Sequence, residues 1–282
     1  MISILRIEMR RSLLVRLSPF AAAALVALMV NDIHTWRGIW PEGSAHISAP
    51  LLFIGPLMGG ISAWEVRRRH LAGSARGARS GTAPWITPLL IAHLLSGAAV
   101  VAVGALCAII VNLASAAPAG FLWPSYVLVS LACLTECIAV GFLLGRLGGP
   151  AWFAPVITAM LLFLRLVITL PGSGDAMRFH FTRLFLSGRA SVTLSPIGVA
   201  LAVLEAGLVV VLARSVPDLI AHMRATRART AYPWSRTRRR TVVVGGLSCV
   251  VAGALVLTSP QLTRERRPPK EPVCTSTEFR IC

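Results

Sequence analysis

Seven apolar runs follow one another along the chain, and polar or basic stretches separate them. The runs cover residues 17–30 (extending as far as Ile33), 47–63, 86–111, 126–144, 151–170, 196–213 and 241–257. Most of them are close to the roughly 20 apolar residues with which a helix crosses a bilayer core. The pattern therefore predicts an all-α fold, a polytopic helical membrane protein.

The same pattern divides the chain into five parts. We expect an interfacial elbow helix at residues 1–16, a six-span membrane domain at 17–216, a basic cytoplasmic segment at 217–240, a seventh span at 241–258 and an exterior Pro-rich tail at 259–282. The basic segment has two interpretations: a docking surface for a partner, or a stretch that only holds the topology and contacts anionic lipid.

Composition supports a membrane protein and argues against a nucleic-acid-binding one. Hydrophobic residues make up 55% of the chain and charged residues 14%, whereas a soluble domain is charged at about a quarter of its positions. The net charge of +17 suggests nucleic acid at first sight. However, the basic residues lie in short clusters at the ends of apolar runs, as the preference of cytoplasmic loops for Lys and Arg predicts.

The densest basic cluster lies between the second and third runs, from Trp64 to Trp85. Short basic loops stay in the cytoplasm, so this loop predicts a cytoplasmic N-terminus and an exterior C-terminus. It is also the largest polar surface that a cytosolic partner meets between the early spans. Its candidate docking residues are Trp64, Glu65, Arg67, Arg68, Arg69, Arg76 and Arg79.

The first 16 residues combine an apolar stripe with basic side chains. Ile2, Leu5, Met9 and Leu13 share one face of a helix, and Arg6, Arg10, Arg11 and Arg16 surround them. Such a helix lies in the headgroup plane with its Arg side chains toward anionic lipid. The alternative is the basic region of a cleaved signal peptide, and we favour the uncleaved interfacial helix.

Two features of the spans predict contacts between helices. The second run contains Gly55-Pro56 and Gly59-Gly60, which either kink the helix or let a neighbour approach closely. In the third run, His93 is expected to form a hydrogen bond to a neighbouring helix.

Three ionisable residues fall near the middle of spans: Glu136, Arg165 and Glu205. A charge at that depth costs about 2.5–3.5 kcal/mol or more unless it is paired or faces a polar cavity. Glu136 and Arg165 are offset by about 7.5 Å along the helix axes, so an ion pair between them is geometrically feasible. The trio is therefore either the polar lining of a translocation path or an ion pair that fixes helix packing.

Other chemistry receives little support. Cys133 and Cys137 share a helix face but have no further ligands with metal-binding spacing, and catalytic signatures such as His-Glu-x-x-His or Gly-x-Ser-x-Gly are missing from the sequence. We expect no enzyme activity, metal or cofactor. Cys274 and Cys282 follow the last span on the oxidising side and form a possible disulfide.

Three stretches together resemble the membrane subunits of type-2 (exporter-class) ATP-binding-cassette transporters. Ile4-Leu5-Arg6-Ile7-Glu8-Met9-Arg10-Arg11 is similar to that family's elbow helix. Ala63-Trp64-Glu65-Val66-Arg67-Arg68-Arg69 resembles the start of its coupling loop, and residues 176–189 resemble its short exterior helices. The likeness covers about residues 1–216.

The resemblance implies a permease subunit of a plasma-membrane exporter. Its partners would be a separate ATPase and a second permease, in a homodimer or heterodimer. The seventh span and the tail are additional to the six-span pattern, and the chain from Pro272 onward looks like the start of an exterior domain. The alternative function is therefore a membrane anchor or sensor that presents an exterior domain without transport.

Overall fold

The computed structural model describes residues 2–75, 85–115, 118, 120–148, 150, 152–168 and 196–227. All nine elements within these ranges are α-helices, which confirms the all-α fold class. They are α1 (Ile2–Arg11), α2 (Leu13–Asn31), α3 (Ile33–Trp36), α4 (Trp40–His46), α5 (Leu51–Ala75), α6 (Ile86–Leu113), α7 (Pro124–Leu147), α8 (Phe153–Ile168) and α10 (Pro196–Arg227). The expected exterior helix at 176–189, the seventh span and the tail with Cys274 and Cys282 lie outside the described residues.

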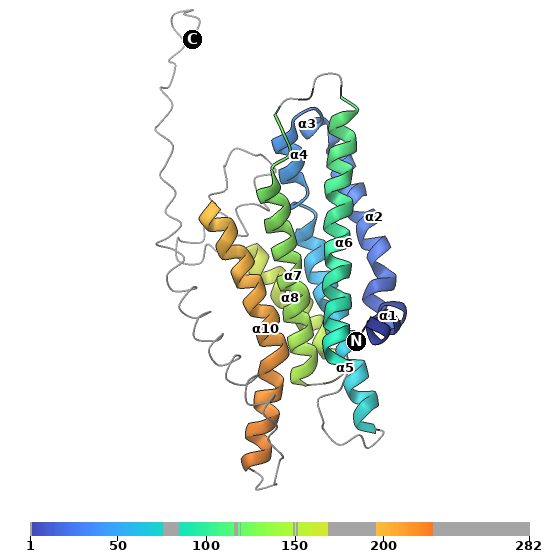
Figure 1. Cartoon of the computed structure of the whole chain (residues 1–282), viewed down its shortest axis with the longest axis vertical. Helices are drawn as coiled ribbons and strands as arrows, with labels where there is room; N and C mark the ends of the chain where they lie inside the picture. The colour runs from blue at the N-terminus through green and yellow to red at the C-terminus, as the bar shows by residue number, and fades with distance from the viewer. Residues whose placement is uncertain are drawn as a thin grey trace, which may run out of the picture.

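The long helices lie side by side along the long axis of the molecule (Figure 1). The short helices α3 and α4 close one end, which we call the Trp-rich end because Trp36, Trp40 and Trp123 lie there. Helix α1 lies at the opposite end, beside the C-terminal part of α5 (Figure 1). We call this the Arg-rich end.

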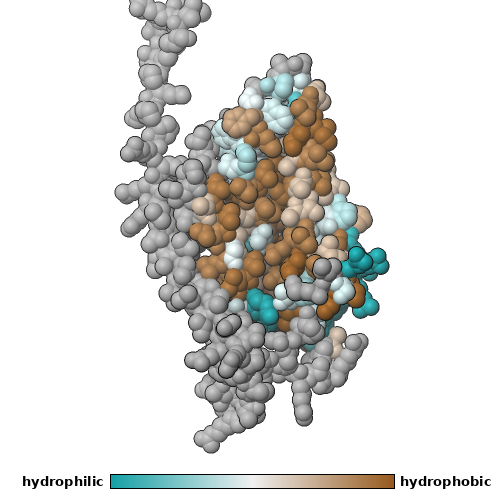
Figure 2. Space-filling view, viewed as in Figure 1, coloured by the Kyte–Doolittle hydropathy of each residue, from teal (hydrophilic) through white to brown (hydrophobic). Residues whose placement is uncertain are grey.

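Four described segments are long and apolar enough to cross a membrane: Leu13–Asn31, Trp40–Ala72, Ile86–Leu113 and Pro124–Leu147. A shorter apolar helix covers Phe153–Leu164. Apolar residues form a broad band around the visible face of the molecule, while the hydrophilic surface gathers near α1 (Figure 2). Large apolar side chains of the spanning helices are exposed, such as Phe20 on α2 at 72% and Leu57 on α5 at 61%. The protein is therefore a polytopic helical membrane protein.

The end of α5 and the start of α2 differ from the boundaries expected from hydropathy. The second apolar run was expected to end at Ala63, but α5 continues as a helix to Ala75. The first span begins at Leu13 and not at residue 17, because Ser12 caps α2 and its side chain accepts a hydrogen bond from the amide of Val15. Hydropathy marks where apolar residues stop, whereas the helix stops where backbone hydrogen bonds stop.

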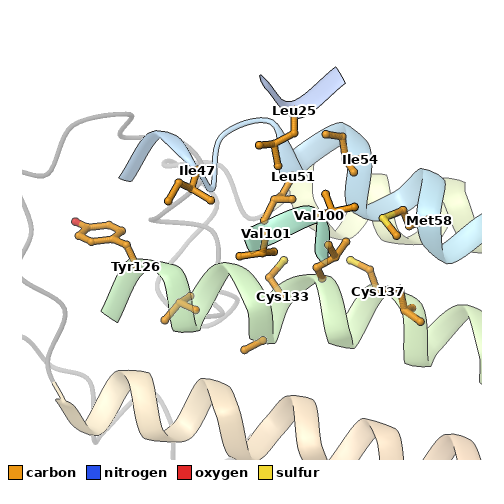
Figure 3. Packing of buried hydrophobic residues seen from close by; sticks show 14 of the residues in the cluster. Leu25, Ile47, Leu51, Ile54, Met58, Val100, Val101, Tyr126, Cys133 and Cys137 are labelled. Carbon is orange, nitrogen blue, oxygen red and sulfur yellow. The ribbon is translucent and has the colours of Figure 1, made fainter. Parts of the chain in front are cut away.

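Helix α7 lies at the centre of the bundle and packs against α5, α6, α8 and α10. Its buried side chains meet those of α2, α5 and α6 in one apolar core, where Cys133 and Cys137 face Val100 and Met58 (Figure 3). The approach to α5 is very close. A Cβ atom on Gly141 would lie 2.0 Å from the carbonyl oxygen of Gly59. The predicted close approach of a neighbour at the glycine pairs of α5 is confirmed, and α5 continues through Pro56 as one helix.

We predict that Gly141→Ala destabilises the protein by about 1–3 kcal/mol, because the added methyl group meets rigid backbone atoms of α5. Thermal unfolding of the purified protein in a mild detergent measures the effect. Gly207→Ala is the matched control, since a Cβ atom there meets nothing within 4 Å. A wild-type melting temperature for Gly141→Ala would show that α5 and α7 are not packed this closely.

Candidate functional site

The carboxylate of Glu65 is the centre of a buried polar cluster at the Arg-rich end. Glu65 lies on α5 and is fully buried. Its Oε2 atom accepts hydrogen bonds from Ser12 Oγ at 2.9 Å, from the amide of Leu13 at 2.8 Å and from the amide of Leu14 at 3.2 Å. The first amides of a helix lack partners within the helix, and its N-terminus attracts negative charge. Glu65 therefore caps α2 from a different helix.

Arg69 connects the same carboxylate to α1. Its Nη2 atom donates to Glu65 Oε1 at 2.6 Å, one helical turn along α5. Its Nη1 atom donates to a carboxylate oxygen of Glu8. Glu8 is itself buried, and its backbone carbonyl accepts from the amide of Ser12 at 2.8 Å. One guanidinium group thus holds the N-terminal helix against α5.

His93 extends the cluster to α6 and α7. Its Nε2 atom lies 3.2 Å from Glu65 Oε2, and its Nδ1 atom lies 3.0 Å from Ser62 Oγ. Ser62 Oγ also donates to the backbone carbonyl of Ile138 on α7 at 3.2 Å. The predicted hydrogen bond from His93 to a neighbouring helix is confirmed. We call Glu8, Ser12, Ser62, Glu65, Arg69 and His93 the Glu65 cluster.

Ser62, His93 and Glu65 have the residue types and the contacts of a hydrolytic triad, but not its accessibility. All three residues are fully buried, so Ser62 Oγ presents no accessible nucleophile. The carboxylate is occupied by Arg69 and by the N-terminal amides of α2. What this arrangement does chemically is to neutralise a buried charge and to join α1, α2, α5, α6 and α7 at one point.

The expectation that Glu65 belongs to an exposed docking loop is corrected by the structure. The sequence placed it among exposed docking residues, but the structure buries it, and Arg69 is engaged in two ion pairs. The reason is that α5 stays helical beyond Ala63, so successive residues point in different directions. Trp64 and Arg67 are half-buried and Arg68 is exposed. Arg76 and Arg79 lie outside the described residues.

A second polar junction lies at the same end, between α7 and α10. Arg146 is nearly enclosed, with its side chain 5% exposed. Its Nη1 atom donates to the backbone carbonyls of Ala213 and Arg214 at 3.1 and 2.9 Å. Its Nη2 atom donates to Asp218 Oδ1 at 2.6 Å, and Arg214 contacts the other oxygen of Asp218 at 3.2 Å. The guanidinium group thereby ties the end of α7 to α10, which continues past the expected end of the sixth span to Arg227.

The three mid-span ionisable residues lie on neighbouring helices. Glu136 is buried on α7 and Glu205 is half-buried on α10, and α10 packs along α7. Arg165 belongs to α8, which also contacts α7. The side chain of Arg165 is outside the described residues, so the Glu136–Arg165 pair stays a prediction.

Sequence reasoning missed Ser12, Ser62 and Asp218 as partners. The sequence did contain a signal for Ser62. It shares one face of α5 with Glu65 and Arg69 by helical spacing, and this face points toward α6 and α1. Within the described part of the chain, no group of three or more His, Cys, Asp or Glu residues has the arrangement of a metal site.

Comparison with protein-family models, with curated proteins and with solved structures finds no match for this chain. The Glu65 cluster and the basic residues around it are therefore the features that bear on its function.

We predict that Glu65→Gln lowers the stability of the protein by about 3–5 kcal/mol, the usual cost of removing one partner from a buried ion pair. The amide keeps the shape of the side chain but leaves the Arg69 charge with only Glu8. Thermal unfolding in detergent measures the loss of stability. Glu42→Gln is the isosteric control, because Glu42 lies half-buried on α4.

A double-mutant cycle with Arg69→Met separates this ion pair from other effects. If the two residues act together, the double variant loses clearly less than the sum of the single variants. Additive losses, or a wild-type melting temperature for Glu65→Gln, would contradict the central role of the carboxylate.

Proposed function

We propose that this protein is the membrane-spanning subunit of an ATP-driven exporter, which couples a separate ATPase to substrate movement across the plasma membrane. The observation that carries the proposal is the Glu65 cluster. It joins a basic N-terminal helix, α1, to the base of α5 and to the first turn of α2. A partner that moves the end of α5 would therefore also move α1, α2 and α6.

The orientation follows from the distribution of charge. The Arg-rich end carries the basic side chains of α1 and α5 and Arg214 of α10, whereas Arg37 is the only Arg of the described residues between Leu17 and Ala63. Short basic segments favour the cytoplasm. In the proposed orientation the N-terminus and the end of α5 face the cytosol, and the Trp-rich end faces outward.

The proposed docking surface begins at Arg68 and continues into the basic segment that follows α5. Arg68 is exposed and forms no part of the Glu65 cluster, so it is available to an acidic surface of the ATPase. ATP-driven closure of two such ATPases, on two permease subunits, would tilt α5 together with its partners. The movement would open a path beside α7, α8 and α10, where Glu136, Arg165 and Glu205 are placed.

One observation favours the alternative function, a membrane anchor or sensor that presents an exterior domain. Arg69 forms ion pairs with Glu8 and Glu65 within the protein, which leaves fewer basic groups for a partner than the sequence suggested. A bundle fixed in this way can support an exterior domain without any transport.

We predict that Arg68→Glu reduces capture of the ATPase at least about tenfold, because a charge reversal places like charges opposite each other across the interface. Capture is measured by co-purifying the tagged protein from its native membranes and identifying an ATP-binding-cassette ATPase by mass spectrometry. ATP hydrolysis by the complex is measured alongside. Arg37→Glu, exposed at the opposite end, is the matched control, and equal loss in both variants would contradict docking at α5.

We also predict that a cysteine introduced at Ala72 resists a membrane-impermeant maleimide in intact cells and reacts after permeabilisation. One introduced at His34 should react in intact cells. Both positions are exposed at opposite ends of the bundle, and the native cysteines are replaced in both proteins. Labelling of the Ala72 position from outside would invert the orientation and remove the ATPase proposal.

A further inference from the structure

Three Arg residues lie at the Arg-rich end, where α5, α7 and α10 share an apolar cluster. Arg146 and Arg214 share the carboxylate of Asp218. Arg67 follows Val66 on α5, and a Cβ atom on Gly145, the residue before Arg146, would lie 3.1 Å from Val66 Cβ. We call Arg67, Arg146, Arg214 and Asp218 the basic junction.

The basic junction differs from the Glu65 cluster in its charge balance. In the Glu65 cluster, Arg69 is matched by two carboxylates. The basic junction contains three Arg residues and one carboxylate among the described residues, and the printed contacts of that carboxylate are with Arg146 and Arg214. The enclosed Nε atom of Arg67 has no hydrogen-bond partner there. An enclosed donor without a partner is costly, and a surplus of positive charge makes the place suited to an anion.

Apolar side chains surround the basic junction on two sides. Val66, Phe142 and Ala213 belong to a buried apolar cluster that α5, α6, α7 and α10 share. Leu71 and Leu147, beside the junction in sequence, expose 39% and 38% of their surface. The junction thus lies at the end of the apolar spans, the depth at which lipid phosphates meet the hydrocarbon core.

We propose that the basic junction binds the phosphate group of an anionic phospholipid in the leaflet at the Arg-rich end, with Arg67 as the principal ligand. Basic pockets between transmembrane helices are known to hold anionic headgroups, and a guanidinium group donates two parallel hydrogen bonds to a phosphate. The exposed Leu71 and Leu147 would lie against the acyl chains. A soluble anion would gain the charge contacts but not these apolar ones.

The test uses the full-length protein, purified and delipidated in a neutral detergent. Phosphatidylglycerol is titrated into the micelles, and the melting temperature and the lipid retained in native mass spectrometry are measured. We expect Arg67→Gln to bind phosphatidylglycerol about five- to tenfold more weakly than the wild type. Without lipid, its melting temperature should equal or exceed that of the wild type, because the variant removes an enclosed Nε donor that has no partner among the described residues. Arg68→Gln, with the same charge change one residue along, should bind like the wild type.

Two further arms identify the source of the phosphate. Phosphatidylcholine and inorganic phosphate alone should raise the melting temperature far less than phosphatidylglycerol. Equal effects of inorganic phosphate would mean a site for a soluble anion and would overturn the lipid proposal. Equal losses in Arg67→Gln and Arg68→Gln would mean general surface attraction and would overturn it too.

Two more measurements separate the lipid contact of Arg67 from misfolding and from ATPase docking. If Arg67→Gln does not fold, Arg67→Lys replaces it, and retention of full phosphatidylglycerol binding by the lysine variant would contradict the bidentate contact. Phosphatidylglycerol binding is measured on the purified protein without an ATPase, whereas docking of the ATPase is tested separately with Arg68→Glu. The lipid site and the ATPase proposal can therefore fail independently of each other.

Discussion

The structure depends on one buried carboxylate, that of Glu65. An ionised group inside a bilayer protein is stable only if charges and hydrogen bonds replace the water that it has lost. Here the replacements come from four other places in the chain: Ser12 and the first amides of α2, Arg69, and His93. Ser12 and the amides belong to the start of α2 and His93 to α6, while Arg69, on α5 itself, also reaches Glu8 on α1. Satisfying the charge therefore fixes the relative positions of α1, α2, α5 and α6.

A second constraint, the contact between α5 and α7, is of a different kind. It rests on the absence of side chains, since Gly59, Gly141 and Gly145 let the two backbones touch. Apolar surface gives little driving force for association in lipid, so close packing and buried polar contacts hold such helices together. The Ser62 bond to the carbonyl of Ile138 adds a polar contact to the same interface. Helices α5 and α7 therefore form the rigid centre against which α2, α6 and α10 are placed.

The sequence predicted the helices and some of the contacts, but not the cluster. The all-α fold follows from apolar runs of spanning length, and the close approach at Gly59 and the bond of His93 follow from residue type alone. The partners of Glu65 could not be predicted in this way, because Ser12 is 53 residues away in the chain and His93 is 28. Periodicity tells which face of a helix carries a polar group, but not which neighbour lies opposite that face.

The run Arg67-Arg68-Arg69 shows why composition alone misjudges such a segment. In the sequence the three Arg residues form one basic patch. On a continuous helix, however, successive side chains point about 100° apart. Arg69 turns inward to Glu65 and Glu8, Arg67 is half-buried with its Nε atom enclosed, and Arg68 faces outward. Removing all three at once would mix the loss of the buried ion pairs with effects on the proposed lipid site and on the proposed docking surface. Each Arg therefore has to be changed separately, and the helical continuation of α5 beyond Ala63 is the structural fact that makes those experiments distinguishable.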